Sequence, residues 1–368
     1  MLRANGFAAR RGKRVGLLTN LNAVDGDLVS TYTILRTASD VHLTALFSPE
    51  HGLAAALADG EVISSSTDTR TGLPIHSLYG ATQHPSADMF ENVDVVVCDS
   101  QDIGTRYYTF TWTMSHMLEA AGEHGVEVII LDRPNPLGGS VSGTALDLRF
   151  ASLVGRYPVP TQPGMTMGEM AQMFNAHWNP TPAPLSVIAC SGYQRAMLWA
   201  ETGLTFVPPS PNMPKLVTAQ HYPGACLVEG TSLSEGRGTA LPFEIVGAPG
   251  LDGEALATAL NTRGWMGVRF RPYFFKPSAS KYAGAVCGGV QAHITDVQTY
   301  RPLEVWLGVL QTIYQQQPFT WNDHFERLIG SDIVRGLIER DEPLDDFLAR
   351  SRLFCTDFDQ QRQPYLLY

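Results

Sequence analysis

Several acidic side chains stand directly after apolar runs in the first half of the chain. Glu50 follows the run of residues 41–47, and Asp102 follows the β-branched run of residues 93–99. In open α/β sheets, ligands bind at the carboxyl ends of the strands. Hydrolysis of a glycosidic bond generally needs two carboxyl groups, one to protonate the leaving oxygen and one to act on the anomeric carbon or on a water. These acids therefore favour glycoside hydrolysis. Helix capping or pairing with an arginine is the alternative for any single acid.

The residues that flank Glu50 predict a sharp turn at a strand end. Pro49 cannot continue a strand ladder, and Gly52 permits a backbone reversal. We expect Glu50 to be the general acid, kept protonated by partial burial near the sheet edge. His51 lies beside it without any metal-binding spacing, which favours a substrate contact or a supporting role.

A second polar segment, residues 99–108, follows the next buried strand. In it Gln101 and Arg106 have the groups to hydrogen-bond a sugar, and Tyr107 and Tyr108 have rings that can stack on one. A helix N-terminus at this point would add an anion site. The alternative is a helix that begins with Thr105 as its cap, with both tyrosines in the core.

The glycine-rich loop of residues 229–239 holds Glu229, Glu235 and Arg237. It lacks G-x-x-x-x-G-K-[ST], and Leu241 interrupts G-x-G-x-x-G, so a nucleotide-using enzyme is disfavoured. A loop that binds an acidic substrate is better supported. With Asp102, either glutamate is a candidate partner for Glu50, and the sequence leaves that choice open.

Other reaction classes lack their motifs. The ten histidines show no H-E-x-x-H, and no G-x-S-x-G is present, so we expect neither a metal nor a serine nucleophile, and no cofactor. A net charge of −10 argues against a nucleic-acid partner. The five cysteines are widely spaced and do not indicate disulfides.

The order of the predicted elements indicates an α/β fold with two domains. Strands at residues 13–20, 41–47, 93–99 and 126–131 alternate with helical segments, as in a parallel sheet. Prolines and glycine-rich turns dominate later. We predict a Rossmann-like catalytic domain over residues 1–155 and a smaller mixed α+β auxiliary domain over residues 156–368. No apolar run is long enough to span a membrane, and the basic start of the chain is not a signal peptide, so we expect a cytoplasmic protein unless an export segment has been removed.

Eight segments, in order from about residue 13 to residue 295, match the pattern of one known family. They are residues 16–20, 46–52, 71–74 with 77–80, 99–109, 131–139, 209–214, 229–239 and 280–284. In them the chain resembles the bacterial exo-β-N-acetylmuramidases of the NamZ type, formerly a domain of unknown function. The resemblance implies an auxiliary domain that closes the cleft, and release of terminal non-reducing N-acetylmuramic acid from peptidoglycan fragments. It places the candidate catalytic glutamate on Glu50 and implicates a tyrosine, among Tyr79, Tyr107 and Tyr108. Ser48 departs from the pattern, because relatives often have glycine there.

The candidate site is therefore a carbohydrate cleft whose partner is a saccharide or a muropeptide. The catalytic candidates are Glu50, Asp102, Glu229, Glu235 and Tyr108. The substrate-binding candidates are Asn20, His51, Tyr79, Gln101, Arg106, Tyr107, Asn135, Asn212, Arg237, Lys281 and Tyr282. Arg106, Arg237 and Lys281 are expected to be available for the lactyl carboxylate of N-acetylmuramic acid. The alternative is a carbohydrate-binding protein that keeps the cleft without turnover.

Overall fold

The computed structural model describes residues 12–58, 60–61 and 63–368. The basic start of the chain, on which the export prediction rests, lies largely outside the described residues. Two compact units are formed: one by the chain up to Ser140 with Gly164–Pro214 and Gln360–Tyr368, the other by Val141–Pro163 and Lys215–Asp359. This division differs from the predicted boundary at residue 155, because residues 164–214 return to the first unit and add a strand to its sheet.

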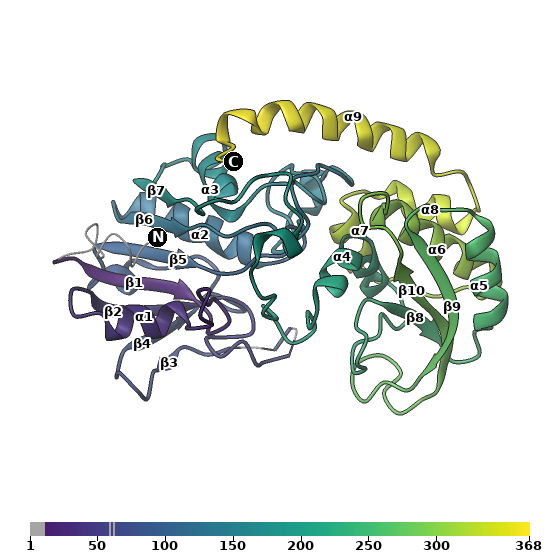
Figure 1. Ribbon diagram of the computed structural model, residues 1–368, viewed down its shortest axis with the longest axis horizontal. Coiled ribbons are helices and arrows are strands. Elements are labelled where there is room, and N and C mark those ends of the chain that lie inside the picture. Colours follow the sequence, from purple (N-terminus) through teal and green to yellow (C-terminus); the bar gives the residue numbers. More distant parts are fainter. Residues whose placement is uncertain (1–11, 59, 62) are drawn as a thin grey trace. The chain divides into compact units, whose positions relative to one another are not determined.

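A seven-stranded sheet forms the centre of the first unit, in the order β3-β4-β2-β1-β5-β6-β7 (Figure 1). Its pairs are parallel except for β3 with β4. The strands are β1 (Arg14–Thr19), β2 (His42–Ser48), β3 (Ser66–Thr67), β4 (Pro74–Ser77), β5 (Val95–Asp99), β6 (Glu127–Leu131) and β7 (Leu185–Ile188). The predicted α/β fold with a mostly parallel sheet is confirmed.

Helices cover both faces of this sheet. Tyr32 and Leu35 of α1 (Thr31–Thr37) pack with Leu17 and Val97 on one face. On the other face, α2 (Phe110–Glu123) packs beside α3 (Met167–His177), and Gly168 of α3 lies against Val187. Short 3-10 turns complete the unit: η2 (Ala87–Phe90), η4 (Trp199–Thr202) and η6 (Gln363–Tyr365).

The strand order explains why the polar segments after β2 and β5 matter. Strand β1 lies between β2 and β5 in the sheet. After β2 the chain continues to β3 and β4 on one side of β1, and after β5 it continues to β6 on the other side. Such a reversal of strand order opens a crevice at the carboxyl edge of the sheet, which is where ligands bind in open α/β folds. Glu50 follows β2 and Asp102 follows β5, so both acids start from this edge.

The second unit is built on a three-stranded antiparallel sheet, β8-β10-β9. Its strands are β8 (Ile245–Ala248), β9 (Val268–Phe275) and β10 (Cys287–Ile294). Its helices are α4 (Leu216–Ala225), α5 (Gly253–Thr262), α6 (Pro302–Gln316), α7 (His324–Ile329) and α8 (Ile333–Glu339), with 3-10 turns η3 (Leu148–Phe150) and η5 (Cys226–Gly230). Helix α9 (Asp345–Arg362) leads the chain back to the first unit. The predicted smaller α+β part is confirmed.

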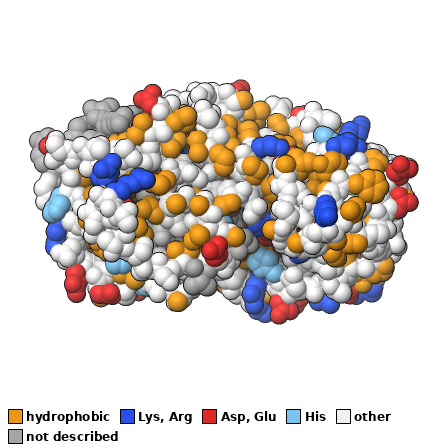
Figure 2. Space-filling model, turned by 90° about the horizontal axis from the view of Figure 1, so that it is seen from below, with side chains coloured by type: hydrophobic (Ala, Val, Ile, Leu, Met, Phe, Trp, Pro, Cys, Tyr) orange, Lys and Arg blue, Asp and Glu red, His pale blue; other side chains and the backbone are white. Residues whose placement is uncertain are grey.

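The basic side chains on one face of the molecule do not form a continuous patch (Figure 2). On the face drawn in Figure 2, lysine and arginine side chains lie in small separate groups among apolar and uncharged ones. Within the described part of the chain, no helix has both the length and the apolar character that a membrane span requires.

The contact between α2 and the segment before β7 gives a test of this packing. A Cβ atom at Gly122 would lie 1.8 Å from the carbonyl oxygen of Thr181. Alanine ordinarily stabilises a helix interior by about 1 kcal/mol relative to glycine. We expect Gly122→Ala instead to lower the free energy of unfolding by about 1–3 kcal/mol, because the backbone must move to relieve the clash.

Urea unfolding monitored by circular dichroism measures this change. Gly26→Ala is the matched control, since nothing lies within 4 Å of a Cβ built at Gly26. A Gly122→Ala variant as stable as the wild type would contradict the packing of α2 described here.

Candidate functional site

Glu50 is a buried carboxylate at the end of β2, with only 5% of its surface exposed. The hydroxyl of Thr109 donates a hydrogen bond to its Oε2 atom at 2.7 Å. The backbone N–H of Gly60 approaches Oε1 at 3.5 Å, which is a weak contact. Thr109 belongs to the segment that follows β5, so two strand ends meet at this side chain, as the sequence predicts for a site at the sheet edge.

The turn after Glu50 is tight and held by His51. His51 and Gly52 both have left-handed backbones, with φ of 70° and 74°. This conformation is costly for a residue with a side chain, so the surrounding contacts must hold it. One of them joins the Nδ1 atom of His51 to the carbonyl oxygen of Leu57 at 2.8 Å. In this structure His51 therefore supports the loop beside Glu50, and its predicted contact with substrate stays a prediction.

Asp102 is the second buried carboxyl group near the start of α2. Its Oδ1 atom accepts the N–H of Gly104 at 2.6 Å, and its Oδ2 atom accepts the hydroxyl of Thr111 at 2.9 Å. Burial raises the pKa of Asp102 to about 6, although these two donors and the backbone N–H of Thr111 act to lower it. A carboxyl group with such a pKa holds its proton in a pH range where ordinary aspartates have lost it.

The loop between β5 and α2 is longer than the sequence indicates. Helix α2 begins at Phe110 with Thr109 as its N-cap, not near Thr105. Gly104, near the start of this loop, has a φ of 77°, and a Cβ atom there would lie 2.0 Å from Oδ1 of Asn135, so this position requires glycine. The polar residues 102–109 therefore form a loop against the carboxyl edge of the sheet.

The two tyrosines of this loop lie in the core of the first unit. Tyr107 and Tyr108 are buried, with the Arg106 guanidinium 5.7 Å from the centre of the Tyr107 ring and Phe110 4.8 Å from the Tyr108 ring. Their burial matches the core alternative better than an open stacking platform. Tyr79 is only half-buried. The assignment of a catalytic or binding tyrosine stays a prediction.

The predicted amide ligands of the first unit mainly hold loops together. Asn20 donates to the carbonyl oxygen of Pro209 at 3.4 Å, and Asn135 donates to that of Met165 at 3.0 Å. Gln101 donates to the carbonyl oxygens of Asp102 and Pro134. Asn212 is half-buried in its proline-rich turn. These contacts place the amides at the edge of the sheet, while their role in substrate binding remains untested.

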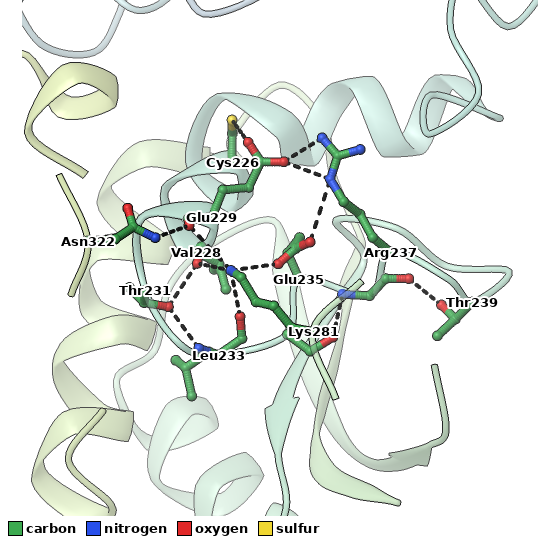
Figure 3. A network of polar contacts seen from close by, with 12 residues as sticks. Cys226, Val228, Glu229, Thr231, Leu233, Glu235, Arg237, Thr239, Lys281 and Asn322 are labelled. Carbon is green, nitrogen blue, oxygen red and sulfur yellow. Dashed lines mark hydrogen bonds and ion pairs between the residues drawn. The ribbon is translucent and has the colours of Figure 1, made fainter. Parts of the chain in front are cut away.

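A separate polar cluster lies in the second unit, around Glu229, Glu235, Arg237 and Lys281 (Figure 3). Arg237 donates to Oε1 of Glu229 from two nitrogen atoms, at 2.8 and 2.5 Å, and lies 3.5 Å from Glu235. Burial acts to raise the pKa of Glu229, but the charge and hydrogen bonds of Arg237 outweigh it and hold the pKa below its ordinary value. An ionised, paired carboxylate is a poor proton donor.

Lys281 fastens the loop that contains these glutamates. Its ammonium group donates to the carbonyl oxygens of Val228 and Leu233, at 3.0 and 2.9 Å, and to Glu235 at 3.0 Å. A lysine has three donor hydrogens, so these contacts occupy its capacity. Tyr282, the next residue, has a φ of 57° and packs against the core cluster of Ile245. The geometry favours a structural role for Lys281 over the predicted lactyl contact.

The first unit also contains a cavity of about 480 Å³ on the face of its sheet that carries α1. Asp99, Gln101 and Arg133 line it, and its apolar wall includes Trp199 and Leu204. Arg133 donates to both oxygens of Asp99, at 2.5 and 2.9 Å, so the polar side is an internal ion pair. Of the described residues that line this cavity, none is Glu50 or Asp102.

Two threonines escaped the sequence-based prediction. The hydroxyls of Thr109 and Thr111 donate to Glu50 and Asp102. In the sequence, only the spacing of hydroxyl side chains within residues 105–111 could have indicated these contacts. Ser48 and Thr105 are buried, and their hydroxyls have no hydrogen-bond partner among the described residues. The described residues also contain no cluster of three histidine, cysteine or acidic side chains placed to hold a metal ion.

Comparisons with known proteins agree along the whole chain. Residues 15–217 match the family described as Exo-beta-N-acetylmuramidase NamZ, N-terminal, and residues 220–368 match its C-terminal counterpart. The chain is 40% identical over 363 residues to the peptidoglycan beta-N-acetylmuramidase NamZ of Bacillus subtilis (strain 168), which covers 97% of this chain and 87% of that protein. Two crystal structures of DUF1343 family proteins from Bacteroides fragilis NCTC 9343 are similar, with TM-scores of 0.92 and 0.80 and identities of 35% and 31%. Each covers 100% of this chain and 97% of its own.

The ion pair of Glu229 and Arg237 gives a test of the second-unit cluster. Arg237→Met leaves the half-buried carboxylate of Glu229 without its charged donor, so we expect the free energy of unfolding to fall by about 1.5–3 kcal/mol at neutral pH. The difference in stability between this variant and the wild type should become smaller at acidic pH. A carboxyl group whose pKa is lower in the folded state than in the unfolded state stabilises the fold at pH values above its unfolded-state pKa. This contribution is lost as the pH falls through the folded-state pKa.

Urea unfolding at several pH values measures both effects. Arg352→Met is the matched control, because Arg352 forms an exposed pair with Glu304 at 3.3 Å and such pairs contribute about 0–1 kcal/mol. An Arg237→Met variant no less stable than this control would show that the cluster is not structural.

Proposed function

The chain belongs to the exo-β-N-acetylmuramidase NamZ family, and from this premise we propose that it hydrolyses terminal non-reducing N-acetylmuramic acid from peptidoglycan fragments with Glu50 and Asp102 as its carboxyl pair. The observation that carries the assignment is the burial of both groups at the carboxyl edge of one sheet, each hydrogen-bonded to a threonine at the start of α2. Two carboxyl groups are the minimum that this chemistry needs.

The environments of the two groups support different roles. The raised pKa of Asp102 suits a group that must hold a proton and give it to the leaving oxygen. Glu50 is the other buried carboxyl group at this edge of the sheet, and we assign to it the action on the anomeric carbon or on a water. These roles reverse the sequence-based expectation, in which Glu50 is the acid.

The other two candidate partners are less suitable. Glu229 and Glu235 both belong to the second unit, where Arg237 and Lys281 pair with them. A carboxylate that already neutralises a half-buried cation cannot change its charge in the reaction without breaking that pair. Asp102 is therefore the partner that we propose for Glu50.

A comparison of the two units also favours Arg106 as the group that binds the lactyl carboxylate. Arg106 lies in the loop that joins Asp102 to Thr109, in the same unit as the proposed carboxyl pair, whereas Arg237 and Lys281 belong to the second unit. An arginine can bind a carboxylate with two parallel hydrogen bonds, which fits recognition of this planar substituent. The lactyl group distinguishes N-acetylmuramic acid from N-acetylglucosamine, so this contact would set the specificity.

Removing either proposed carboxyl group tests the assignment. We expect Glu50→Gln and Asp102→Asn each to lower kcat at least about a hundredfold, because acid–base groups contribute roughly 10²–10⁴ in rate. A chromogenic glycoside of N-acetylmuramic acid gives the rate, and calorimetry shows whether a muropeptide still binds. Turnover by Glu50→Gln at the wild-type rate would refute the site.

The pH dependence and a surface variant complete this test. If Asp102 must be protonated, wild-type kcat falls as the pH rises above about 6, and the residual activity of Asp102→Asn lacks that limb. Glu304→Gln, at an exposed carboxyl group, should keep the wild-type rate. Tight muropeptide binding by the wild type without release of sugar would instead favour a carbohydrate-binding protein.

Substitution of Arg106 tests the specificity. We expect Arg106→Met to reduce the preference for the muramic acid glycoside over the glucosamine glycoside at least about tenfold in kcat/KM, because a charge-assisted hydrogen bond is worth roughly 1.5–3 kcal/mol. Arg106→Lys, which keeps the charge but loses the planar geometry, should lose less. An unchanged preference in Arg106→Met, with a changed one in Arg237→Met, would transfer the role to Arg237.

A further inference from the structure

The hydroxyl of Thr109 is used in an unusual way. Thr109 is the N-cap residue of α2, where a threonine hydroxyl normally accepts a hydrogen bond from a free N–H of the first helical turn. No such cap bond is formed here. The hydroxyl instead donates to Oε2 of Glu50, across 59 positions of the chain.

Asp102 accepts hydrogen bonds from the first turn of α2, which the Thr109 side chain does not cap. A helix start that is buried must have its free N–H groups satisfied. The carboxyl group of Asp102 accepts the backbone N–H and the hydroxyl of Thr111, which is the second residue of α2. Asp102 in this way serves the first turn of α2, while the Thr109 hydroxyl donates to Glu50.

We propose that Thr109 is a positioning residue that fixes the carboxylate of Glu50 for the reaction. This inference rests on the proposed function, and it assigns Thr109 no contact with substrate. Among the described residues, Thr109 gives Glu50 its one short hydrogen bond, and the backbone of Glu50 leads into the left-handed turn at His51. The side chain therefore depends on Thr109 for its orientation, and a catalytic group displaced by about 1 Å loses on the order of a hundredfold in rate.

The experiment compares three variants with the wild type on the chromogenic N-acetylmuramic acid glycoside. Thr109→Val keeps the shape and removes the hydroxyl, so we expect kcat to fall about tenfold to a hundredfold while KM changes less than about twofold. Thr109→Ser restores the donor and should bring kcat back to within a few-fold of the wild type. Loss confined to kcat, with rescue by serine, is not expected if Thr109 only stabilises the fold.

Thr113→Val is the matched control. Thr113 lies one turn further along α2, is also buried, and donates its hydroxyl to the backbone carbonyl of Thr109 at 3.2 Å. We expect this variant to keep the wild-type kcat, although it loses a buried hydroxyl from the same helix. Thermal unfolding and muropeptide titration give the folded, binding-competent fraction, to which each kcat is referred. If Thr109→Val does not fold, Thr109→Ala replaces it with the same expectation.

The possible failures are distinguishable. A Thr109→Val enzyme with the wild-type kcat, or one that serine does not rescue, or a Thr113→Val enzyme with an equal loss, overturns the role of Thr109. A wild-type protein that releases no sugar, or a Glu50→Gln variant that turns over normally, overturns the proposed function or its site instead.

Discussion

The start of α2 is the constraint on which the candidate site depends. A buried helix N-terminus presents free N–H groups that need acceptors, and a buried carboxyl group needs donors. Asp102 and the first turn of α2 satisfy each other's requirements, and the freed hydroxyl of Thr109 then serves Glu50. Two acids from different strand ends are held in this way by one helix. Because the helix also packs through Trp112 on Phe174 of α3, its position is fixed by the core of the first unit.

Burial has opposite consequences for the acids of the two units. Asp102 is surrounded mainly by neutral donors, so loss of solvent dominates and its pKa rises. Glu229 is half-buried, but Arg237 lies in direct contact and its pKa falls. The first environment favours the protonated form of a carboxyl group, and the second favours an ion pair that holds a loop. Two acidic side chains with little access to solvent thus have opposite pKa shifts, and the arginine in contact with Glu229 is the main difference between them.

Much of the fold follows from local sequence patterns. The continuous β-branched run at residues 93–99 and the apolar segment at residues 126–131 predict buried parallel strands, and β5 and β6 form within these two ranges. The division into units could not be read in the same way. Strand β7 joins the first sheet only by pairing with β6 across more than fifty residues, and nothing local to residues 164–214 signals that pairing. A proline-rich texture marked irregular structure correctly but not the unit to which it belongs.

The candidate site shows the same limit at the level of single residues. Glu50 could be singled out because a proline, a histidine and a glycine mark its strand end. Thr109 could not, because the spacing of residues 99–108 is compatible with a helix that has Thr105 as its cap. The chain instead passes through the left-handed backbone of Gly104, which lies close to Asn135, and the helix begins at Phe110 with Thr109 as its N-cap. The threonine that meets the glutamate therefore depends on where this loop ends, and the identity of a positioning residue is for that reason a property of the fold rather than of the motif.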